Sequence, residues 1–421
     1  MILIKPSLRA AFCLFFFCTF LLAQNVVEEL VPPPHIKTIK LKGKGDFTGT
    51  SVFKLGEPII LTFDDINGNE EDYYYKISYY NFDWTPSQLY KNEFLDGMDG
   101  IRIFNYENSF NAYQLYSHYR LRIPNDDTNG LKVSGNYLLE IYNDSDDLIF
   151  SRKFILYEDI TTIGVAIKRS RDLNFIDTKQ VVQFEINSPT EILRNPNRTV
   201  RTLVIQNNNL KTAITDLVPQ FTIGTSLVYK YDQEASFWGG NEYLFFDNKE
   251  VRTATANIQR IDLQEIYHNY LFTDIMRANR PYTYNPDVNG SFVVRNLRAD
   301  DSNTQADYVQ MHFSLECFAP IGDGELHVFG NFNNFILDDT TRLTFNKETA
   351  LYQTSILFKQ GFYNYTYVLL KPDGTLEPGF VSGNFDETEN DYMVVAYYRA
   401  PTARYDRAIG RGMGNSRNIR N

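Results

Sequence analysis

Few residues in this chain have types and spacing that suit catalysis or metal binding. The sequence contains no His-x-His and no Cys-x-x-Cys, and its five histidines are scattered: His35, His118, His268, His312 and His327. This spacing supplies no ligand set for zinc or iron. No Gly-x-Ser-x-Gly elbow occurs, and nothing around Cys317 is typical of an activated thiol, so we interpret it as a small buried residue. We predict no catalytic residue, no metal and no cofactor.

Carboxylates offer two further kinds of chemistry. The acidic stretch at residues 64–72 has the oxygen ligands that calcium prefers, but it departs from the EF-hand pattern, and a solvated hairpin is the interpretation we favour. Carboxylate pairs for glycoside hydrolysis are assembled from distant strands, so spacing along the chain does not test them. Chains without a metal, nucleophile or cofactor motif are more often binding modules. We therefore expect a binding protein and not an enzyme.

The N-terminus has the pattern of an export signal. Lys5 and Arg9 precede an apolar run at residues 10–22, and Ala23 stands before polar residues. This run of about 13 residues is shorter than the roughly 20 that a membrane span needs. We predict a signal peptide at residues 1–23, cleaved after Ala23, and an N-terminal linker at residues 24–35; an uncleaved anchor is the alternative.

Composition then limits the class of partner. The mature chain would carry 39 Lys and Arg against 52 Asp and Glu, a net charge of −13. This balance argues against a nucleic-acid partner, and no later stretch has the length and apolarity of a membrane span. Cys317 would be the one remaining cysteine, so an internal disulfide is excluded and stability must come from packing.

Short strand-like runs recur through the first third of the mature chain. In residues 73–80 the polar residues Lys76 and Ser78 alternate with Tyr and Ile, which is the period of a half-buried strand. About seven such runs, separated by polar turns, are typical of an immunoglobulin-like sandwich. They predict a first β-sandwich domain at residues 36–158.

Two more β-rich units follow. Runs rich in β-branched and aromatic residues predict a second domain at residues 159–300, and the polar, aperiodic residues 298–307 suggest a linker. A third domain, residues 301–400, contains a Gly-x-Tyr-x-Tyr-x-Tyr run at residues 361–367, which resembles the early-set (E-set) immunoglobulin-like modules of glycogen- and starch-active enzymes. The predicted fold class is all-β, with consecutive immunoglobulin-like β-sandwich domains.

The last residues differ from the rest in composition. Residues 401–421 hold five arginines and one acid, with Gly and Asn between them. This composition predicts a basic disordered tail. Docking of the tail on an acidic surface is the alternative to an inert, solvated end.

Several stretches together resemble one family, the type 9 secretion system plug proteins of Bacteroidetes. They include Phe82-Asp83-Trp84-Thr85-Pro86-Ser87, Asn105-Tyr106-Glu107-Asn108-Ser109-Phe110-Asn111, Ser236-Phe237-Trp238-Gly239-Gly240-Asn241-Glu242-Tyr243 and Tyr267-His268-Asn269-Tyr270-Leu271-Phe272. The resemblance covers essentially the whole mature chain. It implies a protein at the periplasmic face of the outer membrane that reversibly closes the giant β-barrel translocon (SprA/Sov type) when no substrate is in transit.

The family pattern itself supplies no contact residues. Loops rich in Tyr, Trp and Phe suit an interface, because rigid aromatic anchors lose little entropy on binding. Two segments, residues 81–102 and 277–289, have this composition, and they place the candidate partner-binding residues at Phe82, Trp84, Tyr90, Phe94, Tyr282 and Tyr284. For Trp84 and Tyr106, a place in the sandwich core is the open alternative.

A carbohydrate-binding protein of the periplasm or cell surface is the alternative function, suggested by the third domain. It predicts affinity for an α-glucan that depends on Phe332, Phe335 or Tyr363. E-set modules bind sugar mainly with paired tryptophans, and the third domain has none, so we interpret its aromatic residues as packing and expect no bound glycan.

Overall fold

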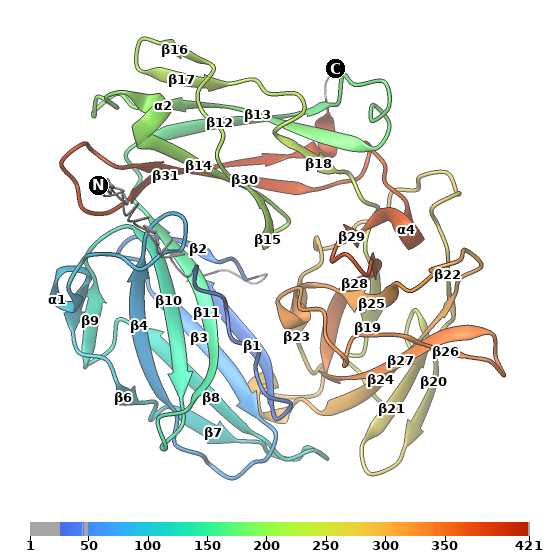
Figure 1. Ribbon diagram of the computed structural model, residues 1–421. Coiled ribbons are helices and arrows are strands. Elements are labelled where there is room, and N and C mark those ends of the chain that lie inside the picture. Colours follow the sequence, from blue (N-terminus) through green and yellow to red (C-terminus); the bar gives the residue numbers. More distant parts are fainter. Residues whose placement is uncertain (1–25, 44, 46–48, 420–421) are drawn as a thin grey trace, which may run out of the picture.

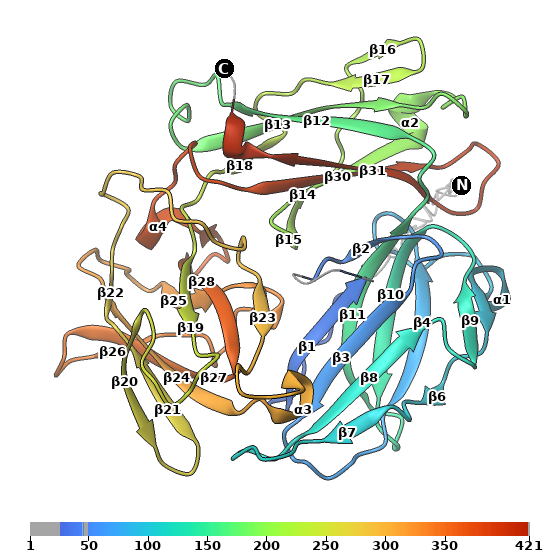
Figure 2. The same ribbon diagram turned by 180° about the vertical axis from the view of Figure 1, so that it is seen from behind.

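The computed structural model of the protein describes residues 26–43, 45 and 49–419. The expected signal peptide lies outside these residues. The described chain forms three β-sandwiches placed at the corners of a triangle (Figures 1 and 2). Strands dominate and the helices are single turns, so the predicted all-β sandwich fold is confirmed.

Alternating side chains build the first sandwich. In β4, Tyr75, Ile77 and Tyr79 are buried, while the residues between them lie on the other, partly exposed face. The sheets β1-β3-β8-β7 and β2-β11-β10-β4-β6 enclose this core, and a short β5–β9 ribbon stands beside them. The elements are β1 (Ile36–Gly43), β2 (Val52–Lys54), β3 (Ile59–Asp65), β4 (Tyr74–Tyr80), α1 (Lys91–Phe94), β5 (Leu95–Gly97), β6 (Ile101–Arg102), β7 (Tyr106–Asn108), β8 (Ser117–Ile123), β9 (Thr128–Leu131), β10 (Gly135–Tyr142) and β11 (Leu148–Tyr157).

The second sandwich is built from two parts of the chain that are far apart in sequence. Its sheets are β12-β13-β17-β16, with β18 also on β13, and β15-β14-β30-β31. The elements are β12 (Thr162–Arg169), β13 (Lys179–Asn187), α2 (Pro196–Thr199), β14 (Val200–Gln206), β15 (Asn209–Ile214), β16 (Phe221–Ile223), β17 (Ser226–Tyr229), β18 (Ser236–Trp238), β30 (Asp391–Tyr398), β31 (Arg407–Asn415) and η2 (Ser416–Asn418).

This pairing corrects two expectations. β30 is hydrogen-bonded to β14 from Val200 opposite Tyr398 to Gln206 opposite Tyr392, so residues 391–398 complete the second sandwich and not the third. β31 pairs with β30 along its whole length, so residues 407–415 form a strand where we expected a disordered tail. Backbone pairing between strands almost 200 residues apart leaves no local pattern in the sequence.

Glycines explain why the last strand looked disordered. Gly410, Gly412 and Gly414 fall on one face of β31; Gly412 and Gly414 lie against β12 of the opposite sheet, and Gly410 lies against Thr161 just before β12. A Cβ atom on Gly412 would stand 2.6 Å from the carbonyl oxygen of Ile163, which is far inside van der Waals contact. Here glycine allows two backbones to approach closely.

The third sandwich is inserted between β18 and β30 of the second. Its sheets are β19-β28-β23, with β25 and β29 also on β28, and β20-β21-β24-β27-β26, with β22 also on β24. The elements are β19 (Leu244–Asp247), β20 (Ile258–Leu263), β21 (Tyr267–Leu271), β22 (Asp274–Ile275), β23 (Phe292–Val294), α3 (Ser302–Gln305), β24 (Tyr308–Glu316), β25 (Glu325–Phe329), η1 (Asn331–Asn333), β26 (Thr344–Asn346), β27 (Leu351–Lys359), β28 (Gly361–Leu370), β29 (Leu376–Glu377) and α4 (Gly379–Ser382). The expected linker at residues 298–307 therefore lies inside this sandwich, and so do residues 244–300.

Apolar packing joins the first and second sandwiches. A separate buried cluster spans their junction and consists of Val52, Ile155, Tyr157, Leu203, Ile205, Met393, Val395, Tyr397 and Ala408. The Tyr397 hydroxyl donates to Asn136 Oδ1 at 2.7 Å across the same junction. Burial of this size makes the two sandwiches one body.

Polar contacts join the first sandwich to the third. Asp64 at the end of β3 is completely buried and accepts hydrogen bonds from Tyr308 and Lys359 of the third sandwich, both at 2.6 Å. His118 Nδ1 lies 2.6 Å from the other oxygen of Asp64. Burial by itself would raise the pKa of this carboxyl, but Lys359 and His118 hold the pKa below its usual value. The acidic turn that we considered for calcium thus begins with a carboxylate that is already engaged within the protein.

Candidate interaction surface

Phe82 and Trp84 lie in a tight turn at the junction of the first and second sandwiches. Asp83 Oδ1 accepts from the backbone N–H and the hydroxyl of Thr85, which fixes the turn. Trp84 adopts φ 61°, in the left-handed region. The ring of Phe82 stands edge-on to the ring of Tyr397, with 4.9 Å between the centroids. The backbone N–H of Phe82 donates to Asp406 Oδ2.

Trp84 belongs to the junction and not to a sandwich core. Its ring is partly buried at the edge of the apolar cluster between the two sandwiches, and Lys153 Nζ lies 4.6 Å from the ring centroid. Tyr106, by contrast, stacks on Tyr119 at 5.3 Å and packs against the first core. A place in the sandwich core was the open alternative for both residues. Tyr106 packs against that core, whereas Trp84 does not.

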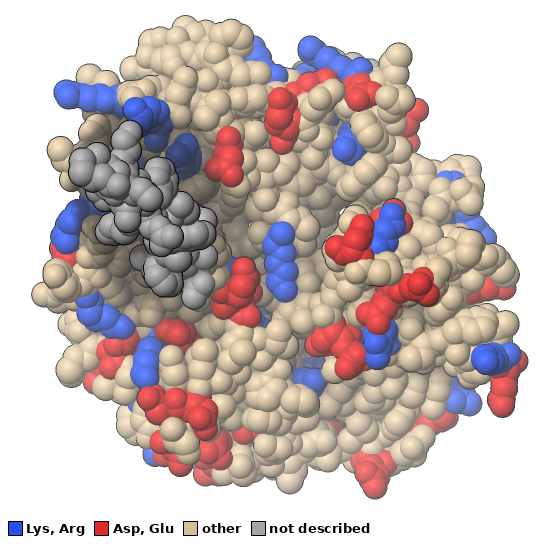
Figure 3. Space-filling model, in the orientation of Figure 1, with Lys and Arg blue, Asp and Glu red and all other residues tan. Residues whose placement is uncertain are grey.

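A cleft of about 1170 Å³ opens beside Phe82 and Trp84. Its walls come from the first and second sandwiches, and Asn334 of the third sandwich also contributes. The cations that line it are Lys153, Arg198, Arg201, Lys211, Arg399 and Arg404. Figure 3 shows Lys and Arg side chains gathered at the left end of the second sandwich, next to its junction with the first. Their positions in separate segments explain why sequence analysis did not identify them as a group.

Tyr90 precedes the single turn α1 and Phe94 is its last residue, and the two side chains differ in exposure. Tyr90 is 74% exposed and is free to contact a partner. Phe94 is 5% exposed and packs 5.6 Å from Tyr79 in the first core. We expected Phe94 to be available for binding, and this expectation is wrong, because the helical turn before β5 directs the side chain inward.

Tyr282 and Tyr284 lie at another junction, between the second and third sandwiches. The Tyr282 hydroxyl donates to Glu242, and its ring lies 5.7 Å from Phe385. Tyr284 is 48% exposed. The two aromatic segments that we singled out in the sequence therefore mark two different junctions and not one patch.

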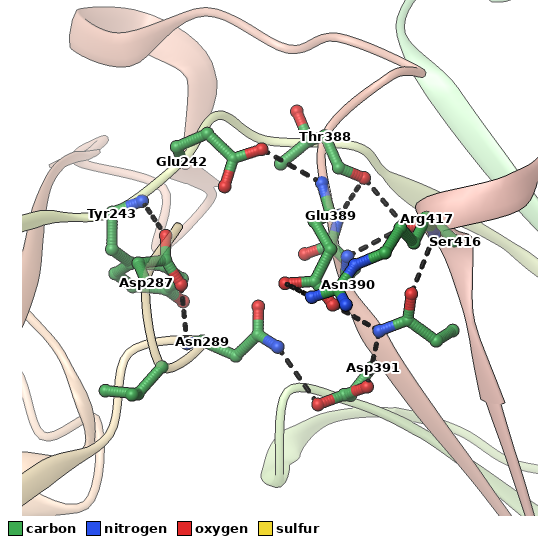
Figure 4. Close-up of polar contacts among 12 residues, drawn as sticks. Glu242, Tyr243, Asp287, Asn289, Thr388, Glu389, Asn390, Asp391, Ser416 and Arg417 are labelled. Atoms are coloured by element: carbon green, nitrogen blue, oxygen red, sulfur yellow. Dashed lines mark hydrogen bonds and ion pairs between the residues drawn. The ribbon is translucent and has the colours of Figure 1, made fainter. Parts of the chain in front are cut away.

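Four carboxylates, Glu242, Asp287, Glu389 and Asp391, lie near one another at this second junction (Figure 4). Asp287 accepts from the N–H groups of Tyr243 and Asn289 at 2.5 and 2.6 Å, and Asn289 donates to Asp391 at 3.0 Å. Glu242 Oε1 accepts from the N–H of Glu389, while its buried Oε2 has no partner in the part of the chain that the structure describes.

The burial and crowding of these carboxylates shift their pKa values. Burial raises the pKa of Asp287 to about 7, the nearby charges of Glu242 and Glu389 act in the same direction, and the two backbone hydrogen bonds oppose the shift. Burial also raises the pKa of Glu242. Among residues 26–43, 45 and 49–419, no three His, Cys, Asp or Glu side chains are grouped so that they could hold a metal ion.

Two of the three residues named for glucan binding are packed inside the third sandwich. Phe335 and Tyr363 are 3% and 2% exposed, whereas Phe332 is partly buried and stands 4.9 Å from Phe358. A sugar ring cannot stack on Phe335 or Tyr363 without opening the core.

The described residues contain no helix with the length and apolarity to cross a membrane.

Comparison with known proteins gives two informative matches. The family model described as "Type 9 secretion system plug protein 1st domain" matches residues 36–158. A crystal structure of a hypothetical protein from Parabacteroides merdae ATCC 43184 is 32% identical, with a TM-score of 0.87, and the match covers 92% of this chain and 98% of that one.

Two other comparisons carry no argument. Three N-terminal domains of the highly immunogenic outer capsid protein of bacteriophage RB49 are 10% identical over 90% of this chain and 97% of that one, but the TM-score is 0.14. No curated protein matches the chain.

Proposed function

The chain belongs to the type 9 secretion system plug proteins, and we propose on this basis that it reversibly seals the outer-membrane translocon pore of that system when no substrate is in transit. The proposed place of action is the periplasmic face of the outer membrane, which an exported chain reaches after loss of its signal peptide. The proposed partner is the giant β-barrel translocon. The action is binding and release, with no chemical step.

The observation that carries the proposal, besides the family, is the closed triangle of sandwiches. A stopper for a wide pore must resist deformation, and here each pair of sandwiches is joined by buried groups. The first and second share an apolar cluster, the first and third share Asp64 and Lys359, and the second and third share Glu242 with the backbone of Glu389. Such contacts oppose the hinge motions that chains of linked domains otherwise show.

Contact with the pore is assigned to the exposed aromatic residues among the candidates. Tyr90 and Tyr284 have accessible rings, and Phe82, Trp84 and Tyr282 are partly buried. Tyrosine suits this role because it combines apolar area with a polar tip at low entropic cost.

Deletion of the gene tests the sealing role. Without the protein, we expect viable cells whose outer membrane admits a large fluorescent solute, and we expect the wild-type gene to restore the barrier. The mature protein, used as bait on detergent-solubilised outer membranes, should retain a very large β-barrel protein. An intact barrier in the deletion strain, together with failure to retain a barrel, would exclude the sealing function.

Photo-cross-linking tests the contact residues separately. A benzoylphenylalanine at position 90 or 284 should form a covalent product with the barrel, whereas the same residue at position 94, which is buried, should not. If position 94 cross-links as well as position 90, the assignment of the surface is wrong even where the sealing function holds.

A further inference from the structure

Residues 26–31, which we call the strap, lie extended against the first sandwich at the cleft. The N–H of Val27 donates to the carbonyl oxygen of Trp84 at 3.0 Å. The N–H of Leu30 donates to Ser151 Oγ at 2.8 Å, and the N–H of Ser151 donates back to the carbonyl of Leu30. The strap was expected to be part of a linker, and its backbone is tied to Trp84 and to Ser151 of β11.

The strap carries two adjacent carboxylates into a basic site. Glu29 accepts from the N–H of Lys153 at 2.7 Å and from Asn334 Nδ2 at 2.5 Å, so it connects the first and third sandwiches. Glu28 is paired with Lys153 Nζ at 3.7 Å and is itself largely exposed. Val26, Glu28 and Glu29 all line the cleft.

Some of the cations at the strap have no counter-charge elsewhere, although Arg399 and Arg404 in the same cleft are paired with Asp406 and Glu93. Arg152 is 7% exposed, donates to the carbonyl of Ser151, and forms no ion pair with a residue that the structure describes. Burial lowers the pKa of Lys211, the charges of Arg152 and Lys153 act in the same direction, and the carboxylates of Glu29 and Glu28 oppose the shift. The strap therefore supplies negative charge to Arg152 and Lys211.

The cleft remains open with the strap in place. The volume of about 1170 Å³ is measured with the strap in place, since strap residues form part of its wall. Arg198 and Arg201 line the side that belongs to the second sandwich, and neither forms an ion pair within the described residues, although Asp83 and Asp216 also line the cleft. Unpaired cations along a half-buried cleft attract anionic groups more strongly than the same cations on an open surface.

We propose that this cleft is a docking site for an extended acidic segment of a partner protein, which displaces the strap and continues along Arg201 and Arg198. The strap shows the binding mode, because its backbone groups pair with Trp84 and Ser151 while its carboxylates meet the cations. These backbone contacts suit a polypeptide and not a nucleic acid or a lipid head group. The inference goes beyond the sealing function, since it holds for any partner that presents such a segment.

The test uses the full mature chain with the strap weakened by Glu28→Gln and Glu29→Gln. The probe is a fluorescein-labelled peptide with the sequence of residues 24–34, preceded by four glutamates, and the control peptide has Gln in place of every Glu. Fluorescence anisotropy at about 50 mM salt measures binding, and about 300 mM salt should weaken it through screening. Circular dichroism and thermal melting establish that each variant is folded.

We expect the acidic peptide to bind the double variant about tenfold more tightly than the wild-type protein, whose own strap competes. Adding Arg198→Glu, Arg201→Glu and Lys211→Glu should weaken binding about tenfold or more. The matched control carries Arg171→Glu, Lys230→Glu and Arg295→Glu, three exposed cations outside the cleft, and should bind like the double variant.

Three outcomes would overturn the proposal. These are failure of the folded double variant to bind the acidic peptide, equal binding of the two peptides, and loss of binding on charge reversal outside the cleft as large as the loss on charge reversal inside it. Each of these would show that the cleft does not recognise acidic polypeptide.

Discussion

Lys359 Nζ lies 2.6 Å from Asp64 Oδ2, and this ion pair joins the third sandwich to the first with both side chains out of contact with water. The two residues are 295 positions apart in the sequence. Tyr116 adds a ring whose centroid is 4.0 Å from the ammonium.

Breaking this pair should uncouple the two sandwiches. Lys359→Met leaves a buried carboxylate without its cation, and the expected loss is about 3–5 kcal/mol in the free energy of unfolding. Denaturant titration measures it. The control is Lys76→Met at the pair with Asp146, which is also short at 2.7 Å but is exposed; the expected loss there is below about 1 kcal/mol. Equal losses at both sites would contradict the structural role of burial.

Gly412 should not tolerate a side chain. Gly412→Val would force β31 away from Ile163 of β12, at an expected cost of about 1–3 kcal/mol. Met413→Val, one residue on and 52% exposed, should change stability by less than about 0.5 kcal/mol. Thermal melting of the two variants beside the wild type gives the comparison, and an unaffected Gly412→Val protein would mean that the two sheets are not in close contact.

Asp287 should make stability fall as pH rises. Its pKa in the folded protein is about 7, above the value of about 3.9 for an unfolded chain, so the folded state binds the extra proton between these two values. Stability from this group is therefore highest below about pH 4, is lost as pH rises to about 7, and is constant above.

Asp287→Asn removes this titration. The melting temperature of the variant, relative to the wild type, should rise between pH 5 and pH 7 and level off above pH 7. The slope is the readout, because the amide also weakens one of the two backbone hydrogen bonds that the carboxylate accepts. Asp144→Asn in an exposed turn is the control, and a parallel slope in that variant would rule out Asp287 as the source.

Tyr90 and Phe94 should separate binding from stability. Phe94→Ala empties part of the first core, at an expected cost of about 3–5 kcal/mol. Tyr90→Ala should change stability by less than about 0.5 kcal/mol, yet it should reduce retention of the barrel in the pull-down. Denaturant titration and the pull-down are run on both variants, and normal retention by Tyr90→Ala would remove Tyr90 from the interface.

Local pattern was sufficient for much of the fold. The alternation in residues 73–80 predicts β4, and the aromatic and β-branched composition predicts sheets throughout, because side chains alternate between the faces of a strand whatever lies around it. Patterns also indicated the aromatic segments around Phe82 and Tyr282, but not their neighbours. Nothing near Phe82 in the sequence points to Tyr397 or Asp406.

The sequence by itself determined that the chain is built of β-strands, that it lacks metal-ligand and nucleophile motifs, and that it resembles one family of secretion proteins. The tertiary structure alone decided that the second sandwich is closed by β30 and β31, that Phe94 is buried, and that Arg201, Lys211 and Glu29 meet in one cleft. The physical reason is that strand periodicity is a property of neighbouring residues, whereas backbone pairing and charge clustering join residues hundreds of positions apart.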